Sequence, residues 1–303
     1  MAARSPYPAR QPTLVGRDRE WAILQDRLTA ACDGQGALVL ISGEAGIGKT
    51  ALVDALAREA EDLGAQVLAG HCYDRTETPP YGPWIQIAAG AAPLGQLEEI
   101  ANQADLFAQT RDFLADLATR RPLLLVLEDL HWADIATLDL LRYIARGLAH
   151  MPLLLVVTYR GQDVQRHHPL AALVPLLVRE ASTERLNVRA LGASAVQELV
   201  RTRYHLAERA AGRLTEFLME RSEGNALYLT EVLRSLEEER LLDQADEPSY
   251  AEILAQTPVP ALLQLIVDDR LARLGDETGR RLRQVTIQGR RRTCISLTIE
   301  MAE

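Results

Sequence analysis

Short apolar runs alternate with segments of helical periodicity along residues 13–190 of this chain. The runs that are typical of strands cover residues 37–42, 66–72, 122–127 and 152–158, with a weaker one at 185–188. Helical patterns between them include 50–63, 97–118 and 135–149. Strands that are apolar along their whole length are buried on both faces, and strands that alternate with helices usually pair in parallel. The pattern therefore predicts an α/β domain over residues 13–190, with a parallel sheet covered by helices on both faces.

The strand-like runs stop after residue 190. Helical spacing at 194–204, 207–221 and 226–240 predicts a helical lid over residues 191–245. A polar break at 243–250 follows, and Pro258 and Pro260 then precede two more helical patterns, 261–274 and 277–284. Residues 1–12 contain three prolines and no apolar core. They are predicted to be a flexible leader and not a signal peptide.

Composition narrows the class of protein. The 303 residues are 48% hydrophobic and 25% charged, as in a soluble globular protein, and no apolar run is long enough for a membrane helix. The net charge of −9 argues against direct nucleic-acid binding by this segment. Three widely spaced cysteines form neither a disulfide framework nor a zinc pattern, which predicts a cytoplasmic location.

A glycine-rich octet follows the strand predicted at 37–42. It reads Gly43-Glu44-Ala45-Gly46-Ile47-Gly48-Lys49-Thr50 and fits the phosphate-binding pattern G-x-x-x-x-G-K-[ST]. Lys49 is the sole lysine among 33 basic residues. In this pattern the backbone and Lys49 would hold the phosphates of a nucleotide, and the Thr50 hydroxyl would ligate Mg²⁺. The alternative is a chance glycine turn before a helix, but strand, loop and helix occur here in the order that the motif requires. ATP or ADP with Mg²⁺ is therefore the predicted ligand.

Two acids, Glu128 and Asp129, directly follow the apolar run at 123–127. A buried strand that ends in carboxylates suits a Mg²⁺-nucleotide site, because one acid can hold the metal through water and the next can polarise the attacking water. By position, Glu128 takes the metal role and Asp129 the catalytic role. The more usual order is aspartate and then glutamate, so the shorter side chain here predicts slow turnover. The alternative is a strand that ends in solvated acids, which the phosphate-binding pattern upstream makes a minor one.

Residues 127–134, reading LEDLHWAD, resemble the signature around the second nucleotide motif of STAND-type AAA ATPases. These are the ATPase modules of large LuxR-type transcriptional regulators, some bacterial adenylate cyclases and related signalling proteins. Residues 14–20 resemble the family's N-terminal motif, which implies that Val15, Gly16 and Arg17 lie beside the adenine. Residues 158–160 resemble its sensor segment, which implies that Arg160 faces the γ-phosphate. The alternative for Arg160 is a solvated charge at a strand end.

The resemblance also covers the rest of residues 12–285. Residues 222–228 resemble the lid motif, with Ala226 in place of the usual proline. The implied fold is a P-loop NTPase three-layer α/β/α domain with sheet order 5-1-4-3-2, followed by the lid and a partial winged helix at 258–303. Residues 285–303 lack a helical period, and the expectation is a truncated or frame-shifted member without an output domain.

Several other residues have simpler interpretations. His131 and Trp132 are predicted to pack in the core, and Asp134 to cap the helix that starts near residue 135. Residues 81–84 are predicted to be a turn with aromatic anchors. His167 and His168 are predicted to be surface or packing residues.

Together these predictions describe a protein that binds ATP, hydrolyses it slowly and acts as a nucleotide-dependent switch of the transcriptional-regulator type. The nucleotide is its predicted ligand, and the expected protein partner is a second copy of the chain or a regulatory protein. The alternative is a non-hydrolysing nucleotide-binding scaffold or a truncated remnant. A small-molecule kinase fits poorly, because no acceptor pocket or catalytic base for one is evident.

Overall fold

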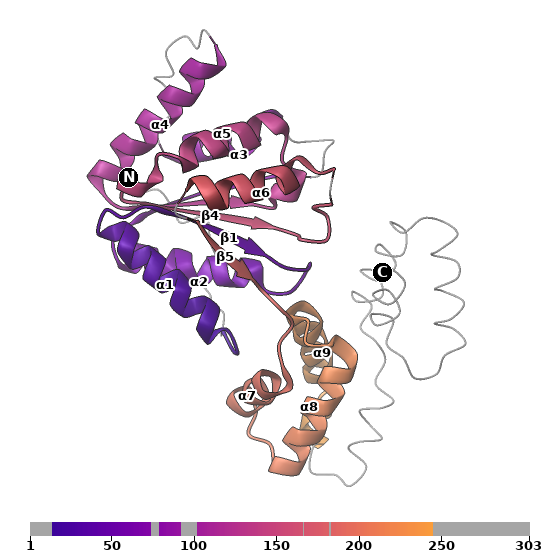
Figure 1. The fold of residues 1–303 in the computed structure, drawn as a ribbon. Coiled ribbons are helices and arrows are strands. Elements are labelled where there is room, and N and C mark those ends of the chain that lie inside the picture. Colours follow the sequence, from indigo (N-terminus) through magenta and orange to yellow (C-terminus); the bar gives the residue numbers. More distant parts are fainter. Residues whose placement is uncertain (1–13, 74–78, 92–101, 166, 182, 245–303) are drawn as a thin grey trace. The chain divides into compact units, whose positions relative to one another are not determined.

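The computed structural model describes residues 14–73, 79–91, 102–165, 167–181 and 183–244 (Figure 1). The chain divides into two compact units, Met1–Arg189 and Ala190–Glu303. This division lies one residue before the predicted end of the α/β domain. The predicted leader at 1–12 and the predicted partial winged helix at 258–303 lie outside the described residues.

The first unit is built on one parallel sheet. Its strands are β1 (Ala37–Ser42), β2 (Gln66–His71), β3 (Leu123–Glu128), β4 (Leu153–Tyr159) and β5 (Thr183–Asn187). Their order across the sheet is β2-β3-β4-β1-β5, and all paired strands are parallel. The predicted order 5-1-4-3-2 is this order read from the other edge, so the predicted fold class is confirmed.

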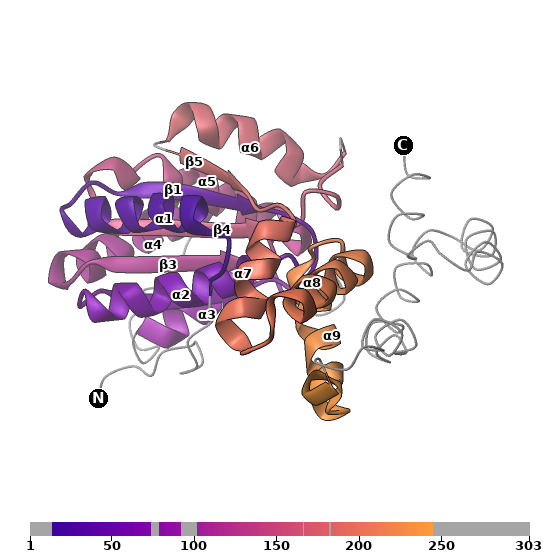
Figure 2. The same ribbon diagram turned by 90° about the horizontal axis from the view of Figure 1, so that it is seen from below.

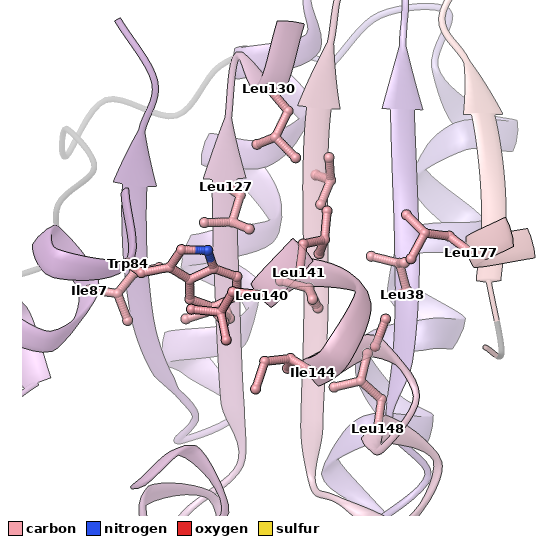
Figure 3. Close-up of a cluster of buried hydrophobic side chains, with 14 of the residues drawn as sticks. Leu38, Trp84, Ile87, Leu127, Leu130, Leu140, Leu141, Ile144, Leu148 and Leu177 are labelled. Atoms are coloured by element: carbon pink, nitrogen blue, oxygen red, sulfur yellow. The ribbon is translucent and has the colours of Figure 1, made fainter. Parts of the chain in front are cut away.

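Helices cover both faces of the sheet (Figures 1 and 2). They are α1 (Asp18–Cys32), α2 (Lys49–Asp62), α3 (Gly82–Ala91), α4 (Gln103–Arg120), α5 (Ile135–Ala145) and α6 (Pro169–Glu180), with short 3₁₀ turns at Leu130–Trp132 and Leu148–His150. Side chains on a strand alternate between faces. In β1, Val39 and Ile41 pack with α1 and α2, whereas Leu38 and Leu40 belong to the core beneath α3 to α6. Figure 3 shows side chains of the core beneath α3 to α6, among them Leu38, Trp84 and Ile144.

Strand β2 forms one edge of the sheet, and helix α3 covers it closely. The Gln86 side chain accepts a hydrogen bond from the His71 amide at 2.9 Å and donates one to the His71 carbonyl at 3.1 Å. An amide side chain thus replaces the missing neighbouring strand at this position, which protects the edge from pairing with another chain.

The predicted turn at 81–84 is only partly correct. Tyr81 has the positive φ of a turn residue, 61°, but α3 begins at the next residue, Gly82. Pro83 does not prevent this, because proline is tolerated in the first turn of a helix. Trp84 is buried, as predicted, and its indole N–H donates to the Thr137 carbonyl of α5 at 3.2 Å.

The second unit contains three helices and a short 3₁₀ turn among its described residues. They are α7 (Ala193–Arg203), α8 (Glu208–Ser222), α9 (Ala226–Glu238) and the turn Leu241–Gln244. The three predicted helices are confirmed with small differences at their ends. They enclose their own apolar core, which includes Val196, Leu214, Leu218 and Leu233. No described helix of either unit is both apolar and long enough to cross a bilayer.

Candidate phosphate-binding site

The octet at residues 43–50 joins the end of β1 to the start of α2. Gly46 has φ 74° and Gly48 has φ 106°, backbone conformations that other residues adopt only at a cost. Gly48 is the N-cap of α2, where no side chain caps the helix and no acid lies in its first turn. The first N–H groups of a helix have no intrahelical partners, and the helix dipole is positive at this end. The start of α2 is therefore suited to bind an anion such as a phosphate.

Lys49 lies at the first position of α2 with its side chain largely buried. Its ammonium donates to the carbonyls of Gly43 at 2.9 Å and of Glu44 at 2.8 Å. Burial lowers the pKa of Lys49 from its ordinary value, and the nearby Asp129 carboxylate acts in the opposite direction. The backbone of the loop thus holds the ammonium where the Asp129 carboxylate acts on it.

Thr50 and Glu128 meet at the predicted metal position. The Thr50 hydroxyl lies 3.4 Å from Oε2 of Glu128, although 78 residues separate them in the sequence. His71, which pairs in register with Glu128 on the next strand, places Nε2 3.5 Å from its Oε1. Among the described residues, no group of three or more His, Cys, Asp or Glu side chains could form a complete metal cage. One hydroxyl beside one carboxylate fits Mg²⁺, which is usually held by few protein ligands together with phosphates and water.

The backbone of Asp129 is held in place by its conformation and by two hydrogen bonds. Its φ of 57° is left-handed, a conformation that aspartate tolerates better than most residues. Its amide donates to the Thr158 hydroxyl at 3.1 Å, and its carbonyl accepts from the Trp132 amide at 2.9 Å. The side chain remains 38% exposed, so water can reach the carboxylate.

Arg160, for which a sensor role is predicted, lies close to this group. Its guanidinium stacks over the Trp132 ring, 5.2 Å from the centroid, and its positive charge acts on Lys49. Nη1 also lies 3.9 Å from Oδ2 of Asp163, an acid to which sequence reasoning assigned no role. Asp163 is in the loop after β4, and only the fold shows that this loop reaches the end of β3.

The packing role predicted for His131 is confirmed. Its side chain is 0% exposed, and its ring lies 4.5 Å from the Trp132 ring. It also faces two acids, because Nδ1 lies 3.8 Å from Oδ1 of Asp129 and Nε2 lies 3.6 Å from Oδ2 of Asp163. The sequence places His131 near Asp129 but gives no indication of its approach to Asp163.

The capping residues around α5 and α6 support this arrangement. Asp134 caps α5 as predicted, accepting from the Thr137 amide at 2.9 Å. His168 caps α6, because its Nδ1 accepts from the Leu170 amide at 3.1 Å. Nδ1 is then the unprotonated nitrogen, so Nε2 carries the proton that it shares with the His131 carbonyl at 2.8 Å.

The N-terminal motif lies against the phosphate loop. Arg17 is 6% exposed and donates to the carbonyls of Ile47 at 2.9 Å and Arg189 at 2.7 Å. Burial lowers the pKa of Arg17, and Glu20 partly offsets this effect. Val15 is half-buried and Gly16 is exposed with φ 65°. The adenine contact implied for Val15, Gly16 and Arg17 remains a prediction.

The lid motif lies in the second unit. Asn225 caps α9 by accepting from the Leu227 amide at 3.1 Å, and Ala226 is the first residue of that helix. Gly224 accepts at its carbonyl from the Leu191 amide at 2.9 Å. The motif thus organises the second unit internally, and its predicted relation to a nucleotide remains a prediction.

Comparisons with known proteins agree with this geometry. The family model described as an AAA ATPase domain matches residues 13–157. An uncharacterized protein of Rhizobium meliloti (strain 1021) is 26% identical over 94% of this chain, which spans 35% of that protein.

Two solved structures show a similar fold. The ORC1 protein of Aeropyrum pernix, in complex with DNA, aligns with a TM-score of 0.55 and 20% identity over 88% of this chain and 70% of that one. Cdc6p of Pyrobaculum aerophilum aligns with a TM-score of 0.57 and 13% identity over 88% and 77%. Residues 13–157 therefore match the AAA ATPase domain family, within a chain whose described sheet has the P-loop NTPase α/β fold.

Proposed function

We propose that this protein binds ATP with Mg²⁺, hydrolyses it slowly and acts as a nucleotide-dependent switch. The observation that carries the proposal is the approach of the Thr50 hydroxyl to the Glu128 carboxylate at 3.4 Å, at the residue that follows Lys49 in α2. A phosphate loop and a strand-end acid from distant parts of the chain converge there, as a Mg²⁺-nucleotide site requires.

Each residue then has a defined task. The loop at 43–50 and the first turn of α2 would hold the β- and γ-phosphates, with Lys49 neutralising their oxygens. Thr50 would ligate Mg²⁺ directly and Glu128 would do so through water. The bound metal would neutralise charge that develops on the phosphates during transfer.

Asp129 and Arg160 would act on the reaction itself. Asp129 would orient and polarise the attacking water, and Arg160 would stabilise the charge on the γ-phosphate. The Asp129 side chain is shorter than the glutamate usual at this position, and its backbone is fixed at both the amide and the carbonyl. The fixed backbone therefore cannot move to bring the shorter side chain closer to the water, which supports slow turnover.

The switch role rests on the second unit and on sequence resemblance. The motifs at 14–20, 127–134, 158–160 and 222–228 resemble STAND-type ATPases of large LuxR-type regulators. Exchange of ATP for ADP can drive such a switch only if the protein has two conformations and ATP favours one of them more strongly than ADP does. A cytoplasmic location, and self-association or a regulatory protein as partner, belong to the same proposal.

Direct nucleic-acid binding by this segment is not part of the proposal. The A. pernix ORC1 structure contains DNA, but it is only 20% identical, and this chain carries a net charge of −9. An acidic chain repels the phosphate backbone that supplies most nucleic-acid affinity.

The test combines phosphate release with nucleotide affinity for four proteins. We expect Lys49→Ala to weaken ATP binding strongly, and Asp129→Asn to retain binding while lowering the release rate about 100-fold or more, the range for loss of a general base. Asp62→Asn, an exposed acid at the far end of α2, should match the wild type.

Two results would change the proposal. Wild-type binding without release above the Lys49→Ala background would leave the alternative, a non-hydrolysing nucleotide-binding scaffold. Absence of ATP binding by the wild type would reject both functions.

A further inference from the structure

Asp163 is an acid of the loop between β4 and α6 whose side chain is 44% exposed. Its Oδ2 lies 3.6 Å from Nε2 of His131 and 3.9 Å from Nη1 of Arg160. One carboxylate oxygen therefore faces both the buried imidazole and the sensor guanidinium.

His131 connects Asp163 to the predicted catalytic acid. Its Nδ1 lies 3.8 Å from Oδ1 of Asp129, on the side of the ring opposite Asp163. The main chain of His131 is held by His168, and its ring packs on Trp132. The position of the ring is thus set by packing, whereas its rotational orientation depends on what faces each nitrogen. At 3.6 Å the Asp163 carboxylate lies just beyond hydrogen-bond distance of Nε2. A small rotation of either side chain would let it accept from this nitrogen and fix the ring orientation, as carboxylates commonly do for functional histidines.

The same acid restrains Arg160. The guanidinium carbon lies 5.2 Å from the centroid of the Trp132 ring, and Nη1 lies 3.9 Å from the Asp163 carboxylate. An aromatic face attracts a cation without strong directional preference, so the attraction of the Asp163 carboxylate at 3.9 Å favours one position of the guanidinium over the ring.

We propose that Asp163 is a positioning residue for hydrolysis, which orients His131 toward Asp129 and holds Arg160 beside the phosphate site. This inference rests on the proposed ATPase function. Asp163 acts through two other side chains and needs no contact with nucleotide, metal or attacking water.

A simpler role for Asp163 is a negative charge that acts on Lys49. The Asp163 charge does act on Lys49, where it opposes the lowering of the lysine pKa by burial. The two roles predict different behaviour for asparagine, which keeps a hydrogen-bond acceptor but loses the charge. A positioning role survives in Asp163→Asn and fails in Asp163→Ala, whereas a charge role fails equally in both.

The kinetic test measures kcat and KM for ATP in these two variants. We expect Asp163→Ala to lower kcat about 10- to 100-fold, the range for loss of a group that orients a functional side chain, with KM within about twofold of wild type. Asp163→Asn should retain most of the wild-type kcat. Gln162→Ala, at the exposed neighbouring position, is the matched control and should be unchanged. Equal losses in Asp163→Ala and Asp163→Asn, or a change confined to KM, would overturn the proposal.

A double substitution tests whether Asp163 acts through His131. In a His131→Gln background, Asp163→Ala should lower kcat much less than it does in the wild type, because residues that act as a unit are not additive. Fully additive losses would show that the two residues act independently, and would overturn the link.

A spectroscopic readout keeps the proposal testable even if the wild type hydrolyses no ATP. Two-bond ¹H–¹⁵N spectra report the bonding of imidazole nitrogens, and His131→Gln identifies the His131 signals. We expect Asp163→Ala to shift the Nε2 resonance of His131 and Asp163→Asn to shift it less. An unchanged spectrum in Asp163→Ala would overturn the proposal, whereas a shift without wild-type phosphate release would reject only the proposed hydrolysis.

Discussion

Gly224 shows how one residue can determine whether a motif folds. Its φ is 78°, and a Cβ at this position would lie 2.1 Å from the Leu191 carbonyl oxygen. The neighbouring atoms are backbone and cannot rotate away. The glycine of the lid motif is therefore required by the close approach of residues 191 and 224, whatever the motif contributes to nucleotide binding.

We predict that Gly224→Ala destabilises the second unit. The left-handed backbone alone would cost about 1–3 kcal/mol, and the contact with Leu191 adds to it. Urea unfolding followed by circular dichroism measures the change. Gly212→Ala, at a half-buried position inside α8, is the control: apart from the helix's own nearby backbone, no atom lies within 4 Å of its added Cβ. It should stabilise the helix by about 0.5–1 kcal/mol. Equal effects of the two substitutions would contradict this account.

At the level of elements, α5 and α6 are joined by an ion-pair network at Glu180. Arg142 donates to both Glu180 oxygens at 3.0 and 2.7 Å, and Arg146 donates to Oε2 at 2.9 Å. Hydrogen bonds from Arg142 and then from Arg146 lower the pKa of Glu180 from 4.5 to about 2. A carboxyl whose pKa is lower in the folded state stabilises the fold above its unfolded pKa, and this contribution is lost as pH falls through the folded value.

We predict that Glu180→Gln lowers Tm by a few degrees at neutral pH, a modest effect because the groups are partly solvated. The difference from wild type should persist down to about pH 4.5 and then shrink as pH approaches 2, because protonated Glu180 resembles glutamine. Thermal unfolding across this range measures it, with Glu61→Gln, an exposed acid of α2, as control. A difference that grows on acidification would contradict the assignment.

Elements differ in how well the sequence predicts them, and burial explains the difference. Strands β1, β3 and β4 are buried along nearly their whole length, so their apolar runs mark them within one residue. Strand β5 buries only Leu186 and begins two residues before the predicted start, because its polar edge gives little periodicity. Helix α3 was missed because a Gly-Pro pair is typical of turns as well as of first helical turns.

The residues of the candidate site also differ in how well the sequence predicts them. Residues 43–50, Glu128 and Asp129 are adjacent to strand ends and follow known spacings, so sequence reasoning finds them. Asp163 and His71 lie in no motif, and the order of strands in the sheet brings them to the site. A single sequence contains little information about such contacts between distant loops.

At the scale of the whole molecule, Arg17 joins three distant segments of the first unit. It connects the N-terminal motif to the phosphate loop at Ile47 and to Arg189, the last residue before the second unit begins. The planar guanidinium of Arg17 reaches the two carbonyls with two different nitrogens. A lysine ammonium has a single nitrogen and cannot reproduce this geometry. A change in the loop upon nucleotide binding would therefore reach Arg189, at the end of the first unit.

We predict that Arg17→Ala lowers stability by about 2–4 kcal/mol, because two carbonyls lose hydrogen bonds from a charged donor. It should also reduce the rise in Tm that ATP produces, since a loosened loop binds the nucleotide more weakly. Arg17→Lys should recover part of both effects. Thermal unfolding with and without Mg²⁺-ATP measures them, and Arg19→Ala, an exposed neighbour on α1, is the control. A full ATP-induced rise in Arg17→Ala would show that Arg17 stabilises the fold without shaping the phosphate loop.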